Sequence, residues 1–195
     1  MEKMTKPRLL ELYSGTGSIG RVFRENGWEV TSVDIDPKFE PTICCNVLDL
    51  TPEMIGDPPD VIWGSPPCTM YSRARTTAKT PRDLEGSDRL VQKVLDLAEF
   101  YGVPFWFENP LGLLKDRPVV AGIPMQLVDY CKYNDGTHPH KARKRTCIWT
   151  NTMWTPARQL CRKDCGFCVG KRHIDSAQLE RIQAVACVAI HPRHG

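Results

Sequence analysis

The chain has 195 residues, of which 41% are hydrophobic and 25% are charged, and its formal net charge is +3. This composition is ordinary for a soluble globular protein with a core of its own, and it argues against a fibrous or disordered chain. No apolar run reaches the length of a membrane span, and the first six residues lack the apolar core of a signal peptide. Nine cysteines without an export signal favour thiol chemistry or metal binding over a disulfide framework.

Short apolar runs alternate with amphipathic stretches over the first two-thirds of the chain. This pattern predicts an α/β fold with a doubly wound, mostly parallel sheet. A polar stretch rich in arginine, threonine and serine, 69–83, predicts a mobile loop. The expected strands are 8–13, 29–33, 43–47, a run at 61–63, a run at 105–107, 126–130 and 146–150. The expected helices are one through Ile19 and Phe23 that ends at Asn26-Gly27, one over 88–101 capped by Ser87-Asp88, and a final one over 176–190.

The first expected strand ends in a glycine-rich turn. Gly15-Thr16-Gly17-Ser18-Ile19-Gly20 matches G-x-G-x-x-G, and Asp34 lies nineteen residues beyond Gly15 at the end of the second strand. Such a loop lets the backbone approach a nucleotide cofactor, and the acid suits ribose hydroxyls. By itself the pattern fits NAD, S-adenosylmethionine or a purely structural turn.

Two further motifs place reactive groups at strand ends. Ser65-Pro66-Pro67-Cys68 resembles the S/N/D-P-P-Y/F signature of amino-methyltransferases with a cysteine in place of the aromatic residue, and Glu108-Asn109 follows a second apolar run. In a parallel sheet both motifs open at the carboxyl ends of strands, where such folds bind ligands. A thiolate and an acid that face one substrate suit attack on an electron-poor pyrimidine. A buried structural cysteine is the alternative for Cys68.

Taken in order, these motifs resemble the DNA cytosine-5 methyltransferases up to about Asn151. Leu12 to Gly17 look like the first cofactor motif of that family. The resemblance implies a Rossmann-like, S-adenosylmethionine-dependent methyltransferase fold, with Asp34 on the ribose and Asp49 on the adenine amine. The implied S-adenosylmethionine-binding residues are Tyr13, Ser14, Gly15, Thr16, Gly17, Asp34, Ile35, Asp49, Leu50 and Pro66.

The resemblance also implies the catalytic residues. Gly64 to Ser72 look like G-G-P-P-C-Q-x-F-S, so Cys68 would add to C6 of a cytosine flipped out of DNA. Glu108-Asn109-Pro110 looks like E-N-V, so the resemblance counts Asn109 among the catalytic residues and has Glu108 hold and protonate N3. Residues 141–145 resemble Q-x-R-x-R, so Arg145 and Arg143 would polarise the cytosine carbonyl or grip its phosphate. The expected reaction is methylation of C5 in DNA; the same chemistry on RNA or a free nucleotide, and a catalytically silent nucleic-acid-binding relative, remain open alternatives.

The chain also departs from the family pattern. Thr69, Pro110 and Lys141 replace the usual Gln, Val and Gln, and the E-N-P form looks like a compact branch often seen in bacteriophages. Fifty residues follow Arg145, too few for a full target-recognition segment. We therefore expect short or relaxed sequence specificity, a monomer, and a cytoplasmic location in a bacterial host cell or its equivalent. The expected division is a catalytic domain over 1–155 and a Cys-rich element with a closing helix over 156–195, packed as part of the same domain.

Cysteines and basic residues gather in the last third of the chain. Between Cys131 and His173 lie ten basic and two acidic residues, which predicts a surface for phosphates or else a solvated basic face. Cys161, Cys165, Cys168 and His173 could form a structural, tetrahedral Zn²⁺ site. An iron–sulfur cluster of the radical S-adenosylmethionine kind and free thiols are the alternatives. The five other cysteines outside the catalytic turn, Cys131 among them, are interpreted as apolar fillers, and His138 and His140 as solvated loop residues.

Overall fold

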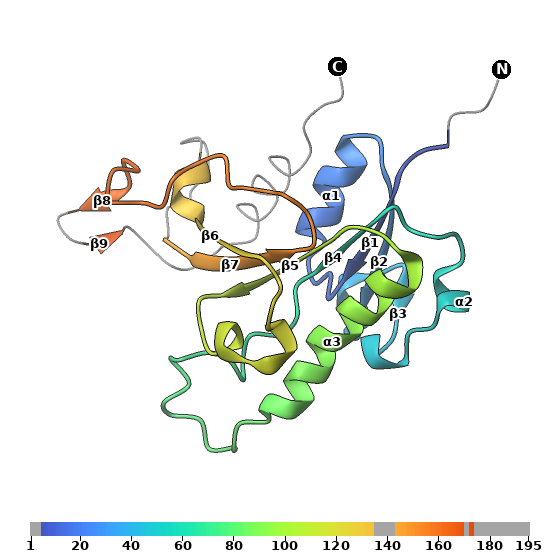
Figure 1. The fold of residues 1–195 in the computed structure, drawn as a ribbon, viewed down its shortest axis with the longest axis horizontal. Helices are drawn as coiled ribbons and strands as arrows, with labels where there is room; N and C mark the ends of the chain where they lie inside the picture. Colours follow the sequence, from blue (N-terminus) through green and yellow to red (C-terminus); the bar gives the residue numbers. More distant parts are fainter. Residues whose placement is uncertain (1–4, 135–142, 170–171, 174–195) are drawn as a thin grey trace.

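A seven-stranded sheet forms the centre of the protein, seen here in a computed structural model that describes residues 5–134, 143–169 and 172–173 (Figure 1). The strand order is β3-β2-β1-β4-β5-β7-β6; the first five strands are parallel, and β7 runs antiparallel to both β5 and β6. The strands are β1 (Arg8–Leu12), β2 (Glu29–Asp34), β3 (Ile43–Cys44), β4 (Val61–Gly64), β5 (Phe105–Pro110), β6 (Met125–Asp129) and β7 (Arg145–Thr150). The predicted mostly parallel α/β fold is confirmed.

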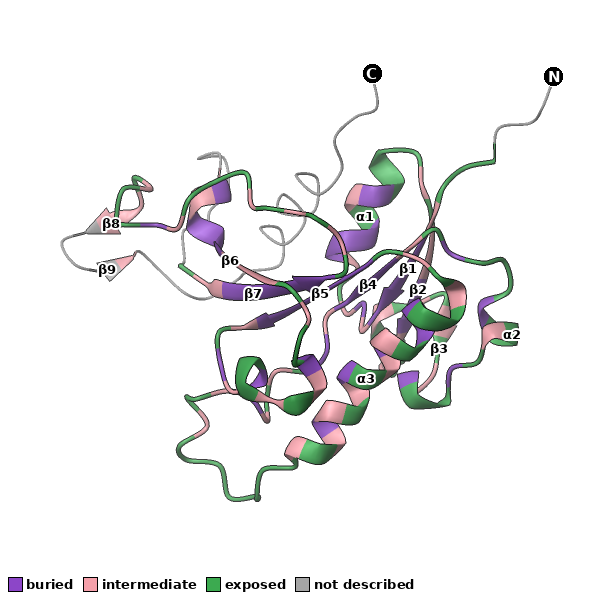
Figure 2. Ribbon diagram, viewed as in Figure 1, coloured by how far each residue is buried: buried purple, intermediate pink, exposed green. Residues whose placement is uncertain are grey.

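Helices cover both faces of this sheet. They are α1 (Ser18–Glu25), α2 (Pro52–Ile55) and α3 (Leu84–Tyr101), with short 3₁₀ helices η1 (Pro37–Phe39), η2 (Val47–Asp49), η3 (Leu114–Asp116), η4 (Pro118–Val120) and η5 (Tyr130–Tyr133). Along β1, Leu10 and Leu12 pack with the buried residues of α3, whereas Leu9 packs with those of α1. Because alternate side chains of a strand point to opposite faces, α1 and α3 lie on opposite sides. The central strands are correspondingly buried in Figure 2.

Helix α3 approaches the sheet closely. At Gly64, the last residue of β4, an added Cβ would lie 2.9 Å from Cγ2 of Val94. Only a glycine therefore lets α3 pack against the strand that leads into the proline turn of the predicted site.

Three predicted boundaries are corrected by local backbone chemistry. α3 begins at Leu84 rather than at residue 88, because the side chain of Asp83, not Ser87 or Asp88, caps it by accepting a hydrogen bond from the Gly86 N–H at 2.7 Å. β1 ends at Leu12 because Tyr13 has a φ of 59°. β3 ends at Cys44 because the Asn46 side chain accepts from the Leu48 N–H and starts η2.

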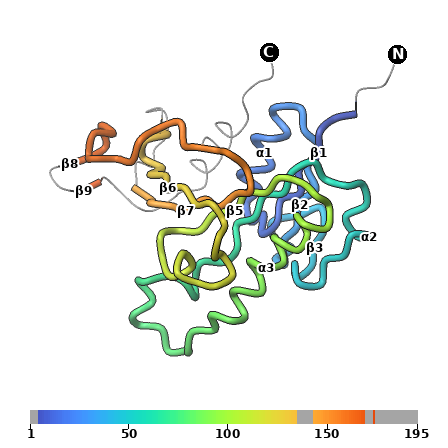
Figure 3. Tube along the Cα trace, in the orientation of Figure 1, coloured from blue at the N-terminus to red at the C-terminus, as the bar shows by residue number. Residues whose placement is uncertain are grey.

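The polar stretch 69–83 is an irregular, largely exposed loop that projects from the body of the molecule (Figure 3). Its first turn is anchored on α3: the Tyr71 hydroxyl donates to Asp88 at 2.8 Å, and Arg117 donates to the same carboxylate at 2.6 Å. The Leu113 N–H donates to the Tyr71 carbonyl at 2.9 Å. The predicted loop is thus confirmed as a loop, and its first turn is held by partly buried polar contacts.

None of the described helices combines the length and apolar character needed to cross a membrane.

The Cys-rich segment follows β7 and ends in a small hairpin of β8 (Cys168–Val169) and β9 (Arg172–His173). It packs against η5, where the backbone N–H of Arg158 donates to the Tyr133 hydroxyl at 3.3 Å. The helix predicted over 176–190, and the loop histidines His138 and His140, lie outside the described residues.

Candidate active site

The turn after β1 has the backbone of a cofactor loop. Gly15 and Gly17 have φ values of 48° and 67°, a region in which glycine is favoured. The Asp34 carboxylate at the end of β2 accepts from the Gly15 N–H at 2.8 Å and from the Asp36 N–H at 2.9 Å. The acid predicted for the ribose therefore also fixes the shape of the glycine turn.

Tyr13 carries backbone strain at the entry to this turn. Its φ of 59° is unusual for a bulky residue and costs about 1–3 kcal/mol. The phenol donates to the Leu90 carbonyl of α3 at 2.8 Å, and burial raises its pKa well above the usual range. The strained backbone is thus tied to α3 through the side chain.

The proline turn that holds Cys68 is fixed by β5. Asn109 is 1% exposed, and its Nδ2 donates to the Pro66 carbonyl at 2.9 Å. The Tyr71 N–H donates to the Cys68 carbonyl at 3.0 Å and closes the following turn. Asn109, which the sequence placed among the catalytic residues, therefore positions the turn that carries the thiol.

One cleft of about 330 Å³ joins the cofactor loop to the catalytic motifs. Cys68 and Glu108, which lie forty residues apart in the sequence, line it together. The structure therefore brings the two predicted motifs, the proline turn with Cys68 and the β5 segment with Glu108, to one cleft. The lining is Glu11, Tyr13, Ser14, Gly15, Thr16, Ser18, Ile19, Phe39, Ser65, Pro66, Pro67, Cys68, Glu108, Pro110 and Lys144.

The remaining residues predicted for the cofactor lie outside this lining. Gly17 lines a neighbouring pocket together with Ser14, Gly15 and Thr16. Asp34 does not line the cleft, and its carboxylate accepts a hydrogen bond from the glycine turn. The Ile35 side chain is 67% exposed, Asp49 is exposed, and Leu50 is buried in the core.

Lys144 contacts Glu108, a relation that the sequence analysis missed. Glu108 is 4% exposed, and the Lys144 ammonium lies 3.6 Å from its Oε1. The same ammonium lies 5.4 Å from the centre of the Tyr130 ring. Lys144 lies between the two motif arginines in the sequence, so the alternation of side chains along a strand could have indicated that it faces the other way.

Arg145 and Arg143 both turn to Asp129 at the end of β6. Arg145 donates to this carboxylate from Nε at 2.9 Å and from Nη2 at 2.7 Å, and Arg143 from Nε at 3.4 Å. Burial disfavours the charged carboxylate of Asp129, but hydrogen bonds from Arg145, the Cys161 N–H and Arg143 outweigh it and hold its pKa below the usual range. The guanidinium groups of Arg143 and Arg145 are thus held on a buried acid, and neither arginine is among the residues that line the cleft.

Glu11 is a second cleft residue that sequence reasoning missed. It is 1% exposed on β1, and burial raises its pKa to about 7, although the Gly20 N–H, Arg24, the Ile19 N–H and Arg21 oppose the shift. An acid inside an otherwise apolar strand was the available signal.

The predicted metal residues gather into one cluster with a different membership. Sulfur and nitrogen atoms of Cys131, Cys161, Cys165 and His173 all lie within 4.8 Å of one another. Cys168 lies beside them, its Sγ 3.4 Å from His173 Nε2 and 3.9 Å from Cys165 Sγ. Cys131, interpreted from the sequence as an apolar filler, is buried but belongs to this cluster, because η5 turns its thiol toward the Cys-rich segment.

Comparison with known proteins identifies one sequence relative and one structural neighbour with a similar fold. The chain is 31% identical over 158 residues to the probable DNA (cytosine-5)-methyltransferase of Frog virus 3 (isolate Goorha), a match that covers 74% of this chain and 70% of the relative. No family model matches the chain. The fold resembles that of the Dnmt2 methyltransferase of S. pombe with a TM-score of 0.50 and 16% identity; the match covers 74% of this chain and spans half of that one.

The sheet, with a glycine loop, a proline-turn cysteine and a glutamate of β5 at one cleft, has the Rossmann-like fold of a methyltransferase. With the frog virus relative, it follows that the chain belongs to the cytosine-5 methyltransferase family. Membership of this family implies S-adenosylmethionine as the methyl donor.

Proposed function

We propose that this protein methylates C5 of cytosine in DNA through a covalent bond between Cys68 and C6. The observation that carries the proposal is the single cleft that contains the glycine loop, Cys68 and Glu108. The fit of the methyl donor is supported by the same cleft, because five of the residues expected to bind it line the cleft: Tyr13, Ser14, Gly15, Thr16 and Pro66. When bound there, S-adenosylmethionine supplies the methyl group as an electrophile.

The chain's own residues perform the remaining chemistry. The Cys68 thiolate adds to C6 while Glu108 gives a proton to N3, so the electron pair of the C5=C6 bond becomes available at C5. After C5 has accepted the methyl group, solvent accepts the C5 proton, and the electron pair of the C5–H bond re-forms the C5=C6 double bond and expels the thiolate. Glu108 then takes back the N3 proton, and both groups return to their starting states.

Lys144 supplies a positive charge to this chemistry, because it is the basic residue in the lining of the cleft. Its ammonium lies 3.6 Å from Glu108, and both residues line the cleft. Once Glu108 has given up its proton, the adjacent ammonium stabilises the carboxylate that remains. We therefore assign Lys144 to the site and expect Lys144→Met to lower turnover at least tenfold. Lys115→Met, which removes another lysine paired with a carboxylate, leaves turnover unchanged.

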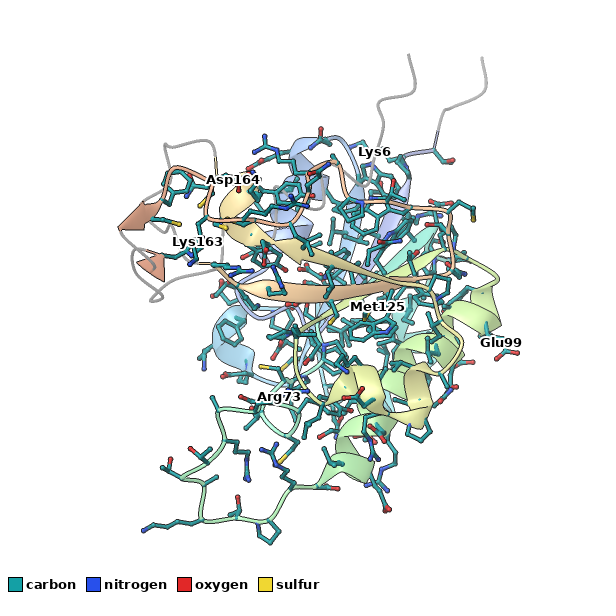
Figure 4. All side chains as sticks on the ribbon, turned by 60° about the vertical axis from the view of Figure 1, so that its left-hand side comes forward. Lys6, Arg73, Glu99, Met125, Lys163 and Asp164 are labelled. Carbon is teal, nitrogen blue, oxygen red and sulfur yellow. The ribbon has the colours of Figure 1, made fainter. Side chains whose placement is uncertain are left out.

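Arg145 and Arg143 are proposed to contact the backbone of the nucleic acid. Their side chains are 30% and 32% exposed, so each guanidinium retains an outer edge for a phosphate while it donates to Asp129. Exposed Arg158, Arg162 and Lys163 extend this basic surface along the Cys-rich segment; Lys163 is labelled in Figure 4. Such contacts would hold a flipped cytosine at the cleft without a large recognition segment.

DNA is favoured over RNA and free nucleotides by the frog virus relative, which is named a probable DNA methyltransferase. The test is transfer of labelled methyl groups by the purified chain to duplex DNA, to RNA of the same sequence and to dCMP, each alone and in competition. The proposal predicts 5-methylcytosine in the DNA. Transfer to RNA or dCMP alone would overturn the proposed substrate, and cofactor binding without transfer to any of the three would identify a silent relative.

A further inference from the structure

Four ligand atoms converge where the Cys-rich segment meets η5. Cys131 and Cys161 are 1% and 4% exposed, and the Cys161 Sγ lies 3.4 Å from His173 Nε2. The sulfur and nitrogen atoms of Cys131, Cys161, Cys165 and His173 all lie within 4.8 Å of one another. In a tetrahedral Zn²⁺ site with bonds of about 2.0–2.3 Å, ligand atoms lie about 3.5–3.8 Å apart. The cluster therefore has nearly the size that one zinc ion requires.

The backbone around the cysteines is arranged for thiolates. The Lys163 N–H donates to Cys161 Sγ at 3.3 Å, and the Phe167 N–H donates to Cys165. In each case the donor lies two residues after the cysteine, and residues with positive φ, Lys163 and Gly166, make the turns. Backbone donors to sulfur are typical outer contacts of metal-bound cysteines. All eight cysteines in the described part of the chain are free thiols. A disulfide among them therefore does not explain why these cysteines lie together.

We propose that Cys131, Cys161, Cys165 and His173 bind one structural Zn²⁺ ion, and that this ion holds the two motif arginines in place through Asp129. Three cysteines and one histidine are a common donor set for structural zinc. The ion would join η5, the loop before β8 and the β9 strand. The part of the proposal that concerns the arginines rests on the proposed function.

Asp129 connects the zinc site to the arginines. Its Oδ2 accepts from the backbone N–H of Cys161 at 2.9 Å and from Arg145 Nη2 at 2.7 Å, and its Oδ1 accepts from Arg145 Nε at 2.9 Å. Arg143 donates to the same Oδ1. A ligand of the ion thus bonds directly to the carboxylate that orients both guanidinium groups, which makes Asp129 a positioning residue.

Cys168 is outside the proposed set. It lies 3.4 Å from the His173 nitrogen and forms the register pair of His173 in the β8–β9 hairpin. Since tetrahedral zinc takes four ligands, the assignment predicts that Cys168 is not needed for binding.

The first test is the zinc content of the full chain, purified under reducing conditions with zinc supplied and measured by mass spectrometry of the metal. We expect one zinc per chain in the native protein, in Cys168→Ser and in Cys147→Ser, and less than a tenth of that in Cys131→Ser. Cys147 is the matched control because its thiol is also fully buried beside β6, outside the cluster. Should Cys131→Ser fail to fold, His173→Asn, at a partly exposed position, is expected to lose the metal.

Native protein without zinc would overturn the site. Full zinc in Cys131→Ser together with its loss in Cys168→Ser would instead establish Cys161, Cys165, Cys168 and His173 as the ligands. These measurements need no substrate, so their outcome is independent of the proposed function.

The second test addresses the arginines through the salt dependence of DNA binding, which a merely structural change in stability would not alter. The logarithm of the association constant for DNA falls linearly with the logarithm of the salt concentration. Removal of zinc by a chelator, or Asp129→Asn, is expected to make this negative slope shallower by about one to two. Asp129→Asn should keep its zinc. An unchanged slope in both samples would overturn the link between the ion and the arginines.

Discussion

The strands β1 to β5 and the segment from η5 to β9 are built in different ways. In the first region, each strand and the turn that follows it are neighbours in sequence, and the cleft forms because parallel strands end at one edge. In the second region, Cys131 lies 30 to 42 positions before the other members of its cluster, Cys161, Cys165 and His173. These residues meet where there is little regular secondary structure. Hydrophobic packing therefore shapes the cleft, whereas ion pairs to Asp129 and the zinc ion that we propose organise the segment from η5 to β9.

The largest expected effect is the loss of the proton donor in the first region. Glu108→Gln should lower turnover by about 10²–10⁴-fold, because a general acid contributes that much and the amide cannot protonate N3. Methyl transfer under single-turnover conditions measures it. Zinc content should not change, since Glu108 lies on β5, away from the cluster; turnover within threefold of the native protein would contradict the assigned role.

Glu11 should make the stability of the first region depend on pH. Its pKa in the folded protein, about 7, is above the 4.5 of an ordinary glutamate, so its carboxyl favours the folded state most below pH 4.5. That contribution, about 2–4 kcal/mol, is lost as the pH rises through about 7. Glu11→Gln should therefore flatten the fall in the free energy of unfolding between pH 4.5 and 8.

Urea unfolding at several pH values measures this difference. Glu25→Gln, at an exposed position of neighbouring α1, is the control and should keep the native pH dependence. The same slope in Glu11→Gln as in the native protein would show that Glu11 is not the titrating group.

Asn109→Ala should both destabilise the protein and lower turnover. It leaves the Pro66 carbonyl without its buried donor, which costs about 1–3 kcal/mol, and it frees the turn that carries Cys68. Thermal unfolding and kcat are the two measurements. If the turn were rigid by its prolines alone, kcat would stay at the native value despite the lower stability.

The smallest expected effect concerns the root of the polar loop. Tyr71→Phe removes the hydroxyl that donates to Asp88, while Arg117 still holds that carboxylate, so we expect a loss of about 1 kcal/mol in the free energy of unfolding. Chemical denaturation measures it, and a loss above 3 kcal/mol would show that Arg117 does not compensate.

The sequence predicted the first region well because local rules govern it. Alternating apolar runs indicated the strands, the G-x-G-x-x-G spacing indicated the glycine turn, and the motifs after two apolar runs indicated that Cys68 and Glu108 meet. The errors there, such as the start of α3, arose where one side chain, that of Asp83, captured a backbone N–H.

The second region was less predictable because its contacts depend on how distant segments meet. Spacing alone grouped Cys161, Cys165 and Cys168 with His173 and could not reveal that η5 brings Cys131 to them. In the same way, the motif pattern indicated Arg145 but neither its bond to Asp129 nor the position of Lys144 beside Glu108. Ion pairs of this kind can be identified only when the relative positions of both strands are known.

The most direct test of the account is whether Cys68 becomes joined to cytosine. Intact mass is measured after incubation of the protein with S-adenosylmethionine and duplex DNA that contains 5-fluorocytosine, whose fluorine blocks the last loss of a proton from C5. The account predicts a covalent protein–DNA adduct that is absent in Cys68→Ser and present in the control Cys44→Ser. Cofactor binding with no adduct in the native protein would contradict it.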